Sequence, residues 1–251
     1  MSLLSKNLES LNAGSGYKFS ATKIDDLGAS EYTLVTIVID VSYSVSSYAA
    51  ELETALKTVV NACDKSARRD NLLIRIVEFS DQLNEIHGFK LFDTIKDADY
   101  DNVLNIGGST ALFDACDEAV RATATYGEQL TSQDYLCNSI IVVITDGENN
   151  RGNIMDASAI KKSVDTAKRA ENLESLITIL VGVTGDDNNL NAYLQEVKDD
   201  GGFTQYVSIG TATPGKIAKL AEFVSQSISS TSSALGTGAA STPLNPSQFT
   251  F

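Results

Sequence analysis

The chain has 251 residues, 43% of them hydrophobic and 21% charged, which is typical of one large globular domain or of one domain with tails. Nineteen basic against 33 acidic residues give a formal net charge of −14, which disfavours nucleic acid because the phosphate backbone would be repelled. No apolar run approaches the roughly 20 residues of a membrane-spanning helix, and residues 1–7 lack the apolar segment of a secretory signal. Three cysteines without CxxC spacing argue against a disulfide framework and a zinc knuckle. We therefore expect a cytoplasmic domain with no membrane partner.

Four short, β-branched apolar runs are the strongest structural signal. They are nearly continuous, as in strands buried on both faces of a parallel sheet. The runs are residues 34–39, 72–77, 140–144 and 176–181. Residues 83–92 alternate apolar and polar side chains, so we expect a further strand near the edge of the sheet, antiparallel to its neighbour.

Helical periodicity fills the gaps between these runs. The apolar faces comprise Leu52, Leu56, Val59, Val60 and Cys63, then Ile160, Val164 and Ala167, then Ile217, Leu220, Ala221, Val224 and Ile228. Strands alternating with helices predict an α/β fold with a doubly wound, mostly parallel central sheet flanked by helices on both faces.

The two ends of the chain differ from this pattern. Residues 1–30 show only weak periodicity and are expected to form an N-terminal extension to a domain over residues 31–228. Residues 229–251 are rich in Ser, Thr, Gly and Ala and contain Pro243 and Pro246. Because this composition offers little apolar area to offset the entropy of ordering, we expect a flexible, low-complexity C-terminal tail.

Two of the expected parallel strands end in an aspartate. Asp40 follows the first run and is succeeded by Ser42 and Ser44, and Asp146 follows the third run with a glycine behind it. Between them, a glycine pair precedes Thr110 just ahead of an expected helix. Ligands of open α/β sheets bind beside the carboxyl ends of the strands, so these five side chains are expected to converge there.

Two carboxylates and three hydroxyls form an all-oxygen set, which suits a hard cation such as Mg²⁺, with Mn²⁺ or Ca²⁺ as alternatives. Taken singly, each piece has a simpler interpretation. The serines after Asp40 can cap a helix, the Asp146-Gly147 pair can be a turn, and Thr110 can be a helix N-cap. Their joint occurrence, in order and on strand ends, favours a metal site.

The same residues resemble the von Willebrand factor type A (vWA) domain with its metal-ion-dependent adhesion site. The D-x-S-x-S motif of that family matches Asp40, Ser42 and Ser44, its separate threonine matches Thr110, and its later aspartate matches Asp146. The resemblance covers roughly residues 32–228 and points to the bacterial or phage intracellular type. It implies a vWA/Rossmann-like fold and a divalent cation held by hydroxyls and aspartate, partly through water.

The resemblance also implies a function, that of a scaffold or adaptor whose metal accepts an Asp or Glu carboxylate from a partner protein, with no catalysis. One position departs from the family pattern, because Tyr43 stands where glycine is most common. A bulky side chain there would narrow the docking surface or contact the partner. The acidic pair that some family members use for a second cation is absent, since Val45, Ser46 and Ser47 follow the motif.

Two other functional classes remain open. Residues Gly210–Lys216 fit most of a phosphate-binding loop, which would make the protein a nucleotide-binding or hydrolysing enzyme, but Ile217 replaces the hydroxyl residue that holds Mg²⁺. The simpler interpretation is a turn whose Pro214 opens the last helix. The other class is a structural or assembly component in which the metal only stabilises the fold.

Three further features are interpreted as structural. Residues 97–108 imitate an EF-hand loop but lack its glycine and glutamate, so we expect a solvated loop. His87 is the sole histidine, and nothing places it near a nucleophile. Cys63 lies on an expected apolar helix face, Cys116 is expected in a helix interior, and residues 186–189 are expected to cap the helix that begins near Leu190.

Overall fold

A computed structural model describes residues 7–14, 16–249 and 251 of the chain. Within them, eight strands form one sheet in the order β1-β2-β5-β4-β3-β6-β7-β8. The strands are β1 (Leu8–Asn12), β2 (Lys18–Thr22), β3 (Glu31–Asp40), β4 (Leu72–Phe79), β5 (Leu83–Leu91), β6 (Leu136–Thr145), β7 (Leu176–Gly182) and β8 (Gln205–Ser208). The α-helices are α1 (Ala49–Asp64), α2 (Leu112–Thr131), α3 (Ser158–Arg169), α4 (Asn188–Gly201) and α5 (Pro214–Thr237).

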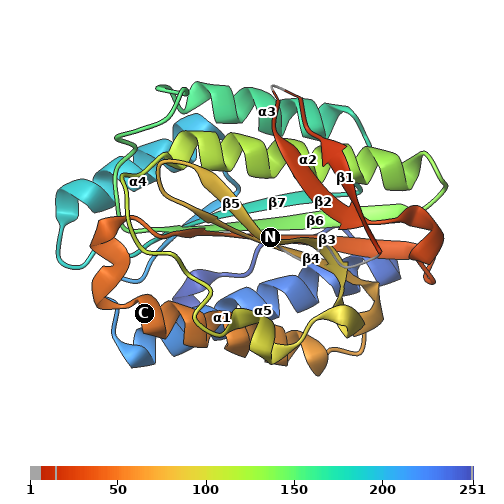
Figure 1. Cartoon of the computed structure of the whole chain (residues 1–251), viewed down its shortest axis with the longest axis horizontal. Helices are drawn as coiled ribbons and strands as arrows, with labels where there is room; N and C mark the ends of the chain where they lie inside the picture. The colour runs from red at the N-terminus through yellow and green to blue at the C-terminus, as the bar shows by residue number, and fades with distance from the viewer. Residues whose placement is uncertain (1–6, 15, 250) are drawn as a thin grey trace.

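The helices cover both faces of the sheet. Helices α1 and α5 lie on one side, and α2, α3 and α4 lie on the other (Figure 1). Strand β3 shows the reason for this layering, because Val35, Ile37 and Ile39 pack towards α1 and α5 while Leu34 and Val38 pack towards α2. Side chains of a strand point alternately to the two faces, so an unbroken apolar run needs a helical layer on each side.

Strands β4, β3, β6, β7 and β8 are parallel, and β5 runs antiparallel to β4. The predicted doubly wound, mostly parallel sheet is therefore confirmed, as is an antiparallel strand over residues 83–92. Strand β5 is not the last strand on its side, however, because β2 pairs with it in parallel and β1 pairs antiparallel with β2. No helix in the described part of the chain is long and apolar enough to cross a membrane.

The described part of the expected N-terminal extension belongs to this sheet, because it contains β1 and β2, although the sequence over residues 1–30 shows only weak periodicity. Arg75 of β4 is fully buried and explains the difference. Its guanidinium pairs with Glu85 at 2.9 Å and lies over the rings of Tyr17, Phe19 and Phe89. Contacts between a cation and aromatic rings cannot be recognised from the periodicity of apolar residues in the sequence. Residues 1–6, on which the expectation of no secretory signal rests, lie outside the described residues.

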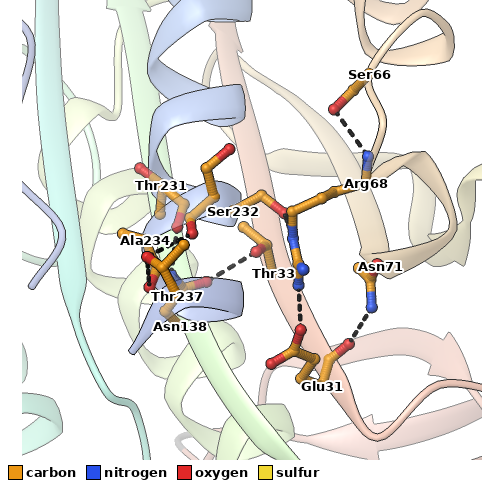
Figure 2. Close-up of polar contacts among 11 residues, drawn as sticks. Glu31, Thr33, Ser66, Arg68, Asn71, Asn138, Thr231, Ser232, Ala234 and Thr237 are labelled. Carbon is orange, nitrogen blue, oxygen red and sulfur yellow. Dashed lines mark hydrogen bonds and ion pairs between the residues drawn. The ribbon is translucent and has the colours of Figure 1, made fainter. Parts of the chain in front are cut away.

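The C-terminal segment is also packed, which corrects the expected boundary at residue 228. Helix α5 continues to Thr237, and Figure 2 shows that its last turns are held by polar contacts. Arg68 donates hydrogen bonds to Glu31 (2.5 Å) and to the Ser232 hydroxyl (3.1 Å), and Asn138 donates one to the Thr231 carbonyl (2.7 Å). Buried Ser and Thr residues with such hydrogen-bond partners are not identified by a search for an apolar helix face.

Beyond the helix, the chain returns along α5. Phe249 is buried and packs edge-to-face on Phe223, with ring centroids 5.2 Å apart. Leu244 accepts a hydrogen bond from Gln205 of β8 at 2.8 Å. Residues 238–249 and 251 thus cover part of the α1/α5 layer instead of lying free of the domain.

Candidate functional site

Asp40 ends strand β3 at the centre of the sheet. Its side chain is buried and accepts hydrogen bonds from the backbone N–H of Ser42 (2.9 Å) and from the hydroxyl of Thr145 (2.6 Å) on the neighbouring strand β6. Both oxygens of the carboxylate therefore have a donor. These bonds fix the direction of the carboxylate before any ligand arrives.

Ser42, Ser44 and Asp146 form a hydrogen-bonded chain beside Asp40. The two serine Oγ atoms lie 3.0 Å apart, and the Ser44 hydroxyl donates to Asp146 Oδ1 at 2.6 Å. Because the Ser44 hydroxyl donates its proton to Asp146, its oxygen accepts the hydrogen bond from the Ser42 hydroxyl. The chain turns into a short 3₁₀ helix over Tyr43–Ser47 directly after β3, which brings both serines back over the strand end.

Thr110 reaches the same place from the loop before α2. It is buried, and a side-chain carbon at position 147 would lie 3.2 Å from its Oγ1, which puts the hydroxyl against the backbone next to Asp146. Its backbone N–H donates to Asn150 Oδ1 at 2.8 Å, and its carbonyl accepts from the Asn150 N–H at 3.0 Å. The alternative role as an N-cap is not seen, because Ala111 holds that position of α2.

The glycine pair before Thr110 allows two loops to approach each other. Gly108 has φ +84°, a left-handed conformation that favours glycine, and its carbonyl accepts from the Tyr43 N–H at 3.3 Å. The loop over residues 107–110 therefore lies alongside the D-x-S-x-S segment. All five predicted site residues, Asp40, Ser42, Ser44, Thr110 and Asp146, stand at the carboxyl ends of β3 and β6 or in loops against them.

The electrostatics of this cluster are unbalanced. Burial raises the pKa of Asp40 to about 6, hydrogen bonds from Thr145 and Ser42 oppose the rise, and the charge of Asp146 adds to it. Burial, with the Asp146 charge second, also raises the pKa of the neighbouring Tyr48 hydroxyl. Within residues 7–14, 16–249 and 251, no ion pair involves either aspartate. Two carboxylates thus face each other without a basic side chain.

The donor set fits a divalent cation of the hard, oxygen-preferring kind. Its two carboxylates and three hydroxyls offer oxygen only, and two negative charges match one such cation. Among the described residues, no group of three or more His, Cys, Asp or Glu side chains could hold a metal. A cation at this cluster would therefore depend on the hydroxyls, not on a dense carboxylate or thiolate cage.

The surrounding side chains include three that sequence reasoning did not single out. Thr145 orients Asp40, Tyr48 is hydrogen-bonded to Asp146, and Asn150 holds the backbone of Thr110. Thr145 and Asn150 lie within four residues of Asp146, so proximity to a strand-end aspartate was the available signal. Tyr43 is 73% exposed and stands at the rim of the cluster.

The phosphate-loop-like segment does not form a phosphate cradle. The ammonium of Lys216 donates a hydrogen bond to the Ile209 carbonyl at 2.9 Å, and a side-chain carbon on Gly210 would lie 3.1 Å from that nitrogen. The lysine therefore already binds the loop itself. Thr213 caps α5 and Pro214 opens it, as the simpler interpretation predicted.

The remaining sequence features are structural, as expected. His87 on β5 is buried, with Nε2 2.7 Å from the Tyr100 hydroxyl and Nδ1 2.8 Å from the Gly88 carbonyl. Residues Asp97–Tyr100 form a 3₁₀ turn, and the Asp187 carboxylate caps α4. Cys63 and Cys116 are buried thiols, and burial raises the pKa of Cys63 to about 12, which keeps it from acting as a nucleophile.

Comparison with solved structures shows the same fold in proteins of low identity. The PilB minor pilin from Streptococcus sanguinis aligns with a TM-score of 0.54 at 17% identity over 84% of this chain and 64% of the pilin. The pilus adhesin SpaC from Lactobacillus rhamnosus GG aligns with a TM-score of 0.54 at 10% identity over 85% of this chain and 31% of the adhesin. Proximal thread matrix protein 1 from the mussel byssus aligns with a TM-score of 0.50 at 19% identity over 81% of this chain and 47% of the mussel protein. This chain spans less than two thirds of each.

Comparison with curated proteins gives no significant match. The family model described as "von Willebrand factor type A domain" matches residues 35–230, which include every strand from β4 to β8, most of β3 and all five residues of the oxygen cluster. On this match, the chain belongs to the von Willebrand factor type A domain family.

Proposed function

We propose that this domain binds one divalent cation through Asp40, Ser42, Ser44, Thr110 and Asp146, and that the cation accepts an Asp or Glu carboxylate from a partner protein. Mg²⁺ is the first candidate, with Mn²⁺ and Ca²⁺ as alternatives. The observation that carries the proposal is the cluster itself, two carboxylates and three hydroxyls gathered at the carboxyl ends of β3 and β6 without a basic side chain.

Charge explains why such a cation would recruit a carboxylate. Asp40 and Asp146 bring −2, which just neutralises a divalent ion, and the three hydroxyls add dipoles but no charge. A cation with only these five side-chain ligands still has an open coordination position, because hard cations of this class take six or more oxygen ligands. An acidic side chain of a partner supplies one of them.

The cluster does not suggest a reaction of its own. It contains no histidine, and the sole histidine of the chain, His87 on β5, is hydrogen-bonded to the Gly88 carbonyl and the Tyr100 hydroxyl. The nucleotide alternative is weakened because Lys216 is bound to the Ile209 carbonyl. We therefore propose a scaffold or adaptor that is not an enzyme. The pilin, the adhesin and the thread matrix protein share the fold, which is compatible with protein binding.

We also propose a reducing, cytoplasmic compartment of a bacterial or phage system. The support is that Cys63, Cys116 and Cys137 are all free and buried. Fractionation of the native host tests this proposal. Recovery of the protein from the cell surface would contradict it.

A binding experiment separates the bridging role from a purely stabilising metal. The immobilised domain is exposed to host lysate in Mg²⁺ and in EDTA, with circular dichroism to verify that the fold survives EDTA. We expect a partner that is retained only in Mg²⁺. Thr110→Ala should release that partner, whereas the matched variant Ser109→Ala, which removes the neighbouring exposed hydroxyl, should not. Equal retention in EDTA would contradict the bridge.

A further inference from the structure

A pocket lies beside the oxygen cluster at the same edge of the sheet. Its volume is about 380 Å³, at the lower end of the roughly 300–1,000 Å³ of small-molecule sites. Its apolar lining includes Phe113 of α2, Met155 of the loop before α3, and Val197 of α4. Its acidic lining consists of Asp156, Glu196 and Asp200.

The pocket and the cluster share two segments, residues 110–113 and 146–149. Asn149 follows Asp146 by three residues, and its Oδ1 accepts from the Phe113 N–H at 3.0 Å. Phe113 in turn follows Thr110 by three residues. The Asn149 N–H donates to the Tyr193 hydroxyl of α4 at 3.1 Å. The pocket therefore lies within reach of a few residues of an extended partner chain bound at the cluster, since an extended chain advances about 3.3 Å per residue.

The charge of the pocket is negative. Glu196 and Asp200 are exposed on successive turns of α4, and neither forms an ion pair or side-chain hydrogen bond in the described part of the chain. Asp156 accepts from the Ser158 N–H at 2.8 Å, and hydrogen bonds from the Ser158 backbone and side chain lower its pKa, with a smaller contribution from the charge of Lys162. Lys198 of α4 is paired with Asp199 at 2.7 Å.

The apolar part of the pocket is open to solvent. Met155 is 71% exposed, one of the three large hydrophobic side chains that the described residues leave exposed. An apolar wall next to unpaired carboxylates matches one kind of side chain, a long aliphatic stem with a cationic end. Neither a purely apolar nor an acidic side chain would satisfy both surfaces.

We propose that this pocket receives a Lys or Arg side chain of the same partner whose carboxylate reaches the cation. This inference rests on the proposed function and adds to it the chemistry of the partner, a segment with an acidic residue and, a few positions away, a basic one. The basic residue also offsets the repulsion between an acidic partner and a domain of net charge −14.

Methionine methyl signals give a direct readout of the pocket. The chain contains two methionines, so ¹³C-methyl-methionine labelling gives two signals, and Met155→Leu identifies one of them. The probes are synthetic Gly/Ser peptides that carry one Asp and, three, four or five positions away, a Lys or its uncharged analogue norleucine. Titrations are run in Mg²⁺ and in EDTA at low and at high salt.

We expect at least one Lys peptide to shift the Met155 signal and to bind more tightly than its norleucine counterpart, with the difference reduced by salt. The double variant Glu196→Gln/Asp200→Asn should weaken the Lys peptide about three- to tenfold, as for two exposed charges, and leave the norleucine peptide unchanged. The matched control Glu174→Gln, one charge removed ahead of β7 at the opposite edge of the sheet, should have no effect.

Equal affinity for the Lys and norleucine peptides, or an unshifted Met155 signal, would overturn the proposal that the pocket receives a basic side chain. If both peptides still bind only in Mg²⁺, the proposed metal bridge stands without it. A Lys preference that is the same in EDTA as in Mg²⁺ would instead support the pocket and contradict the bridge. The two proposals therefore fail separately.

Discussion

Acidification is expected to destabilise the fold through His87. Its ring nitrogens lie 2.7 Å from the Tyr100 hydroxyl and 2.8 Å from the Gly88 carbonyl. A carbonyl only accepts, so Nδ1 carries the proton and Nε2 accepts from Tyr100. This arrangement needs the neutral ring, because a protonated Nε2 could not accept. Burial lowers the pKa of His87 from 6.5 to about 4.

The sign and size of the effect follow from proton linkage. Between about pH 6.5 and pH 4, the unfolded chain binds a proton at His87 that the folded chain does not, so stability is complete above that range and is lost as the pH falls through it. The full shift of about 2.5 corresponds to roughly 3 kcal/mol of unfolding free energy, of which about 2.5 kcal/mol is lost by pH 4.5.

A matched variant isolates this contribution. Burial raises the pKa of Asp40 to about 6 and that of Glu118 to about 7, and these carboxyls favour the folded state as the pH falls through those values. The comparison is therefore between the unaltered chain and His87→Gln, by urea denaturation at about pH 7.5 and about pH 4.5. The unaltered chain should lose about 2–3 kcal/mol more than the variant. Parallel losses in the two proteins would refute the reasoning.

Three further predictions concern the tail, the site and the phosphate-loop-like segment. Phe249→Ala should lower the unfolding free energy by about 2–4 kcal/mol because it exposes Phe223, and an unchanged denaturation midpoint would show that the tail does not pack. Thr145→Val removes the hydroxyl that orients Asp40 and should weaken Mn²⁺ binding about 10- to 100-fold by calorimetry, whereas equal affinity would remove Thr145 from the site. A fluorescent ATP analogue should show no saturable binding, and binding abolished by Lys216→Ala would restore the nucleotide alternative.

The central part of the fold was predictable from the sequence because its signal is local. Each of the four buried strands first recognised contains a nearly continuous, β-branched apolar run, and the helices recognised between them each carry one apolar face. The two ends were not predictable by the same means. Strand β2 is fixed by the cation of Arg75 in the middle of β4, and the end of α5 is fixed by Arg68 and Asn138, so their stability depends on partners far away in the chain.

The candidate site was predictable because neighbouring parallel strands end at the same edge of a sheet. Asp40 and Asp146 both end central strands, and β3 pairs directly with β6, so the two carboxylates had to emerge side by side. The supporting contacts were less accessible. That Thr145 donates to Asp40 depends on a side-chain direction at the end of β6, and that Asn150 holds Thr110 depends on the path of two loops, neither of which a spacing rule specifies.

Calorimetric titration of Mg²⁺ and Mn²⁺ tests the central claim most directly. It compares the unaltered chain, Asp40→Asn, and the matched control Asp81→Asn, whose carboxylate accepts from the nearby Ser109 N–H but is not a proposed ligand. The account predicts one site per chain, loss of binding in Asp40→Asn with the fold intact, and unchanged binding in Asp81→Asn. Equal affinity in Asp40→Asn and the unaltered chain would contradict it.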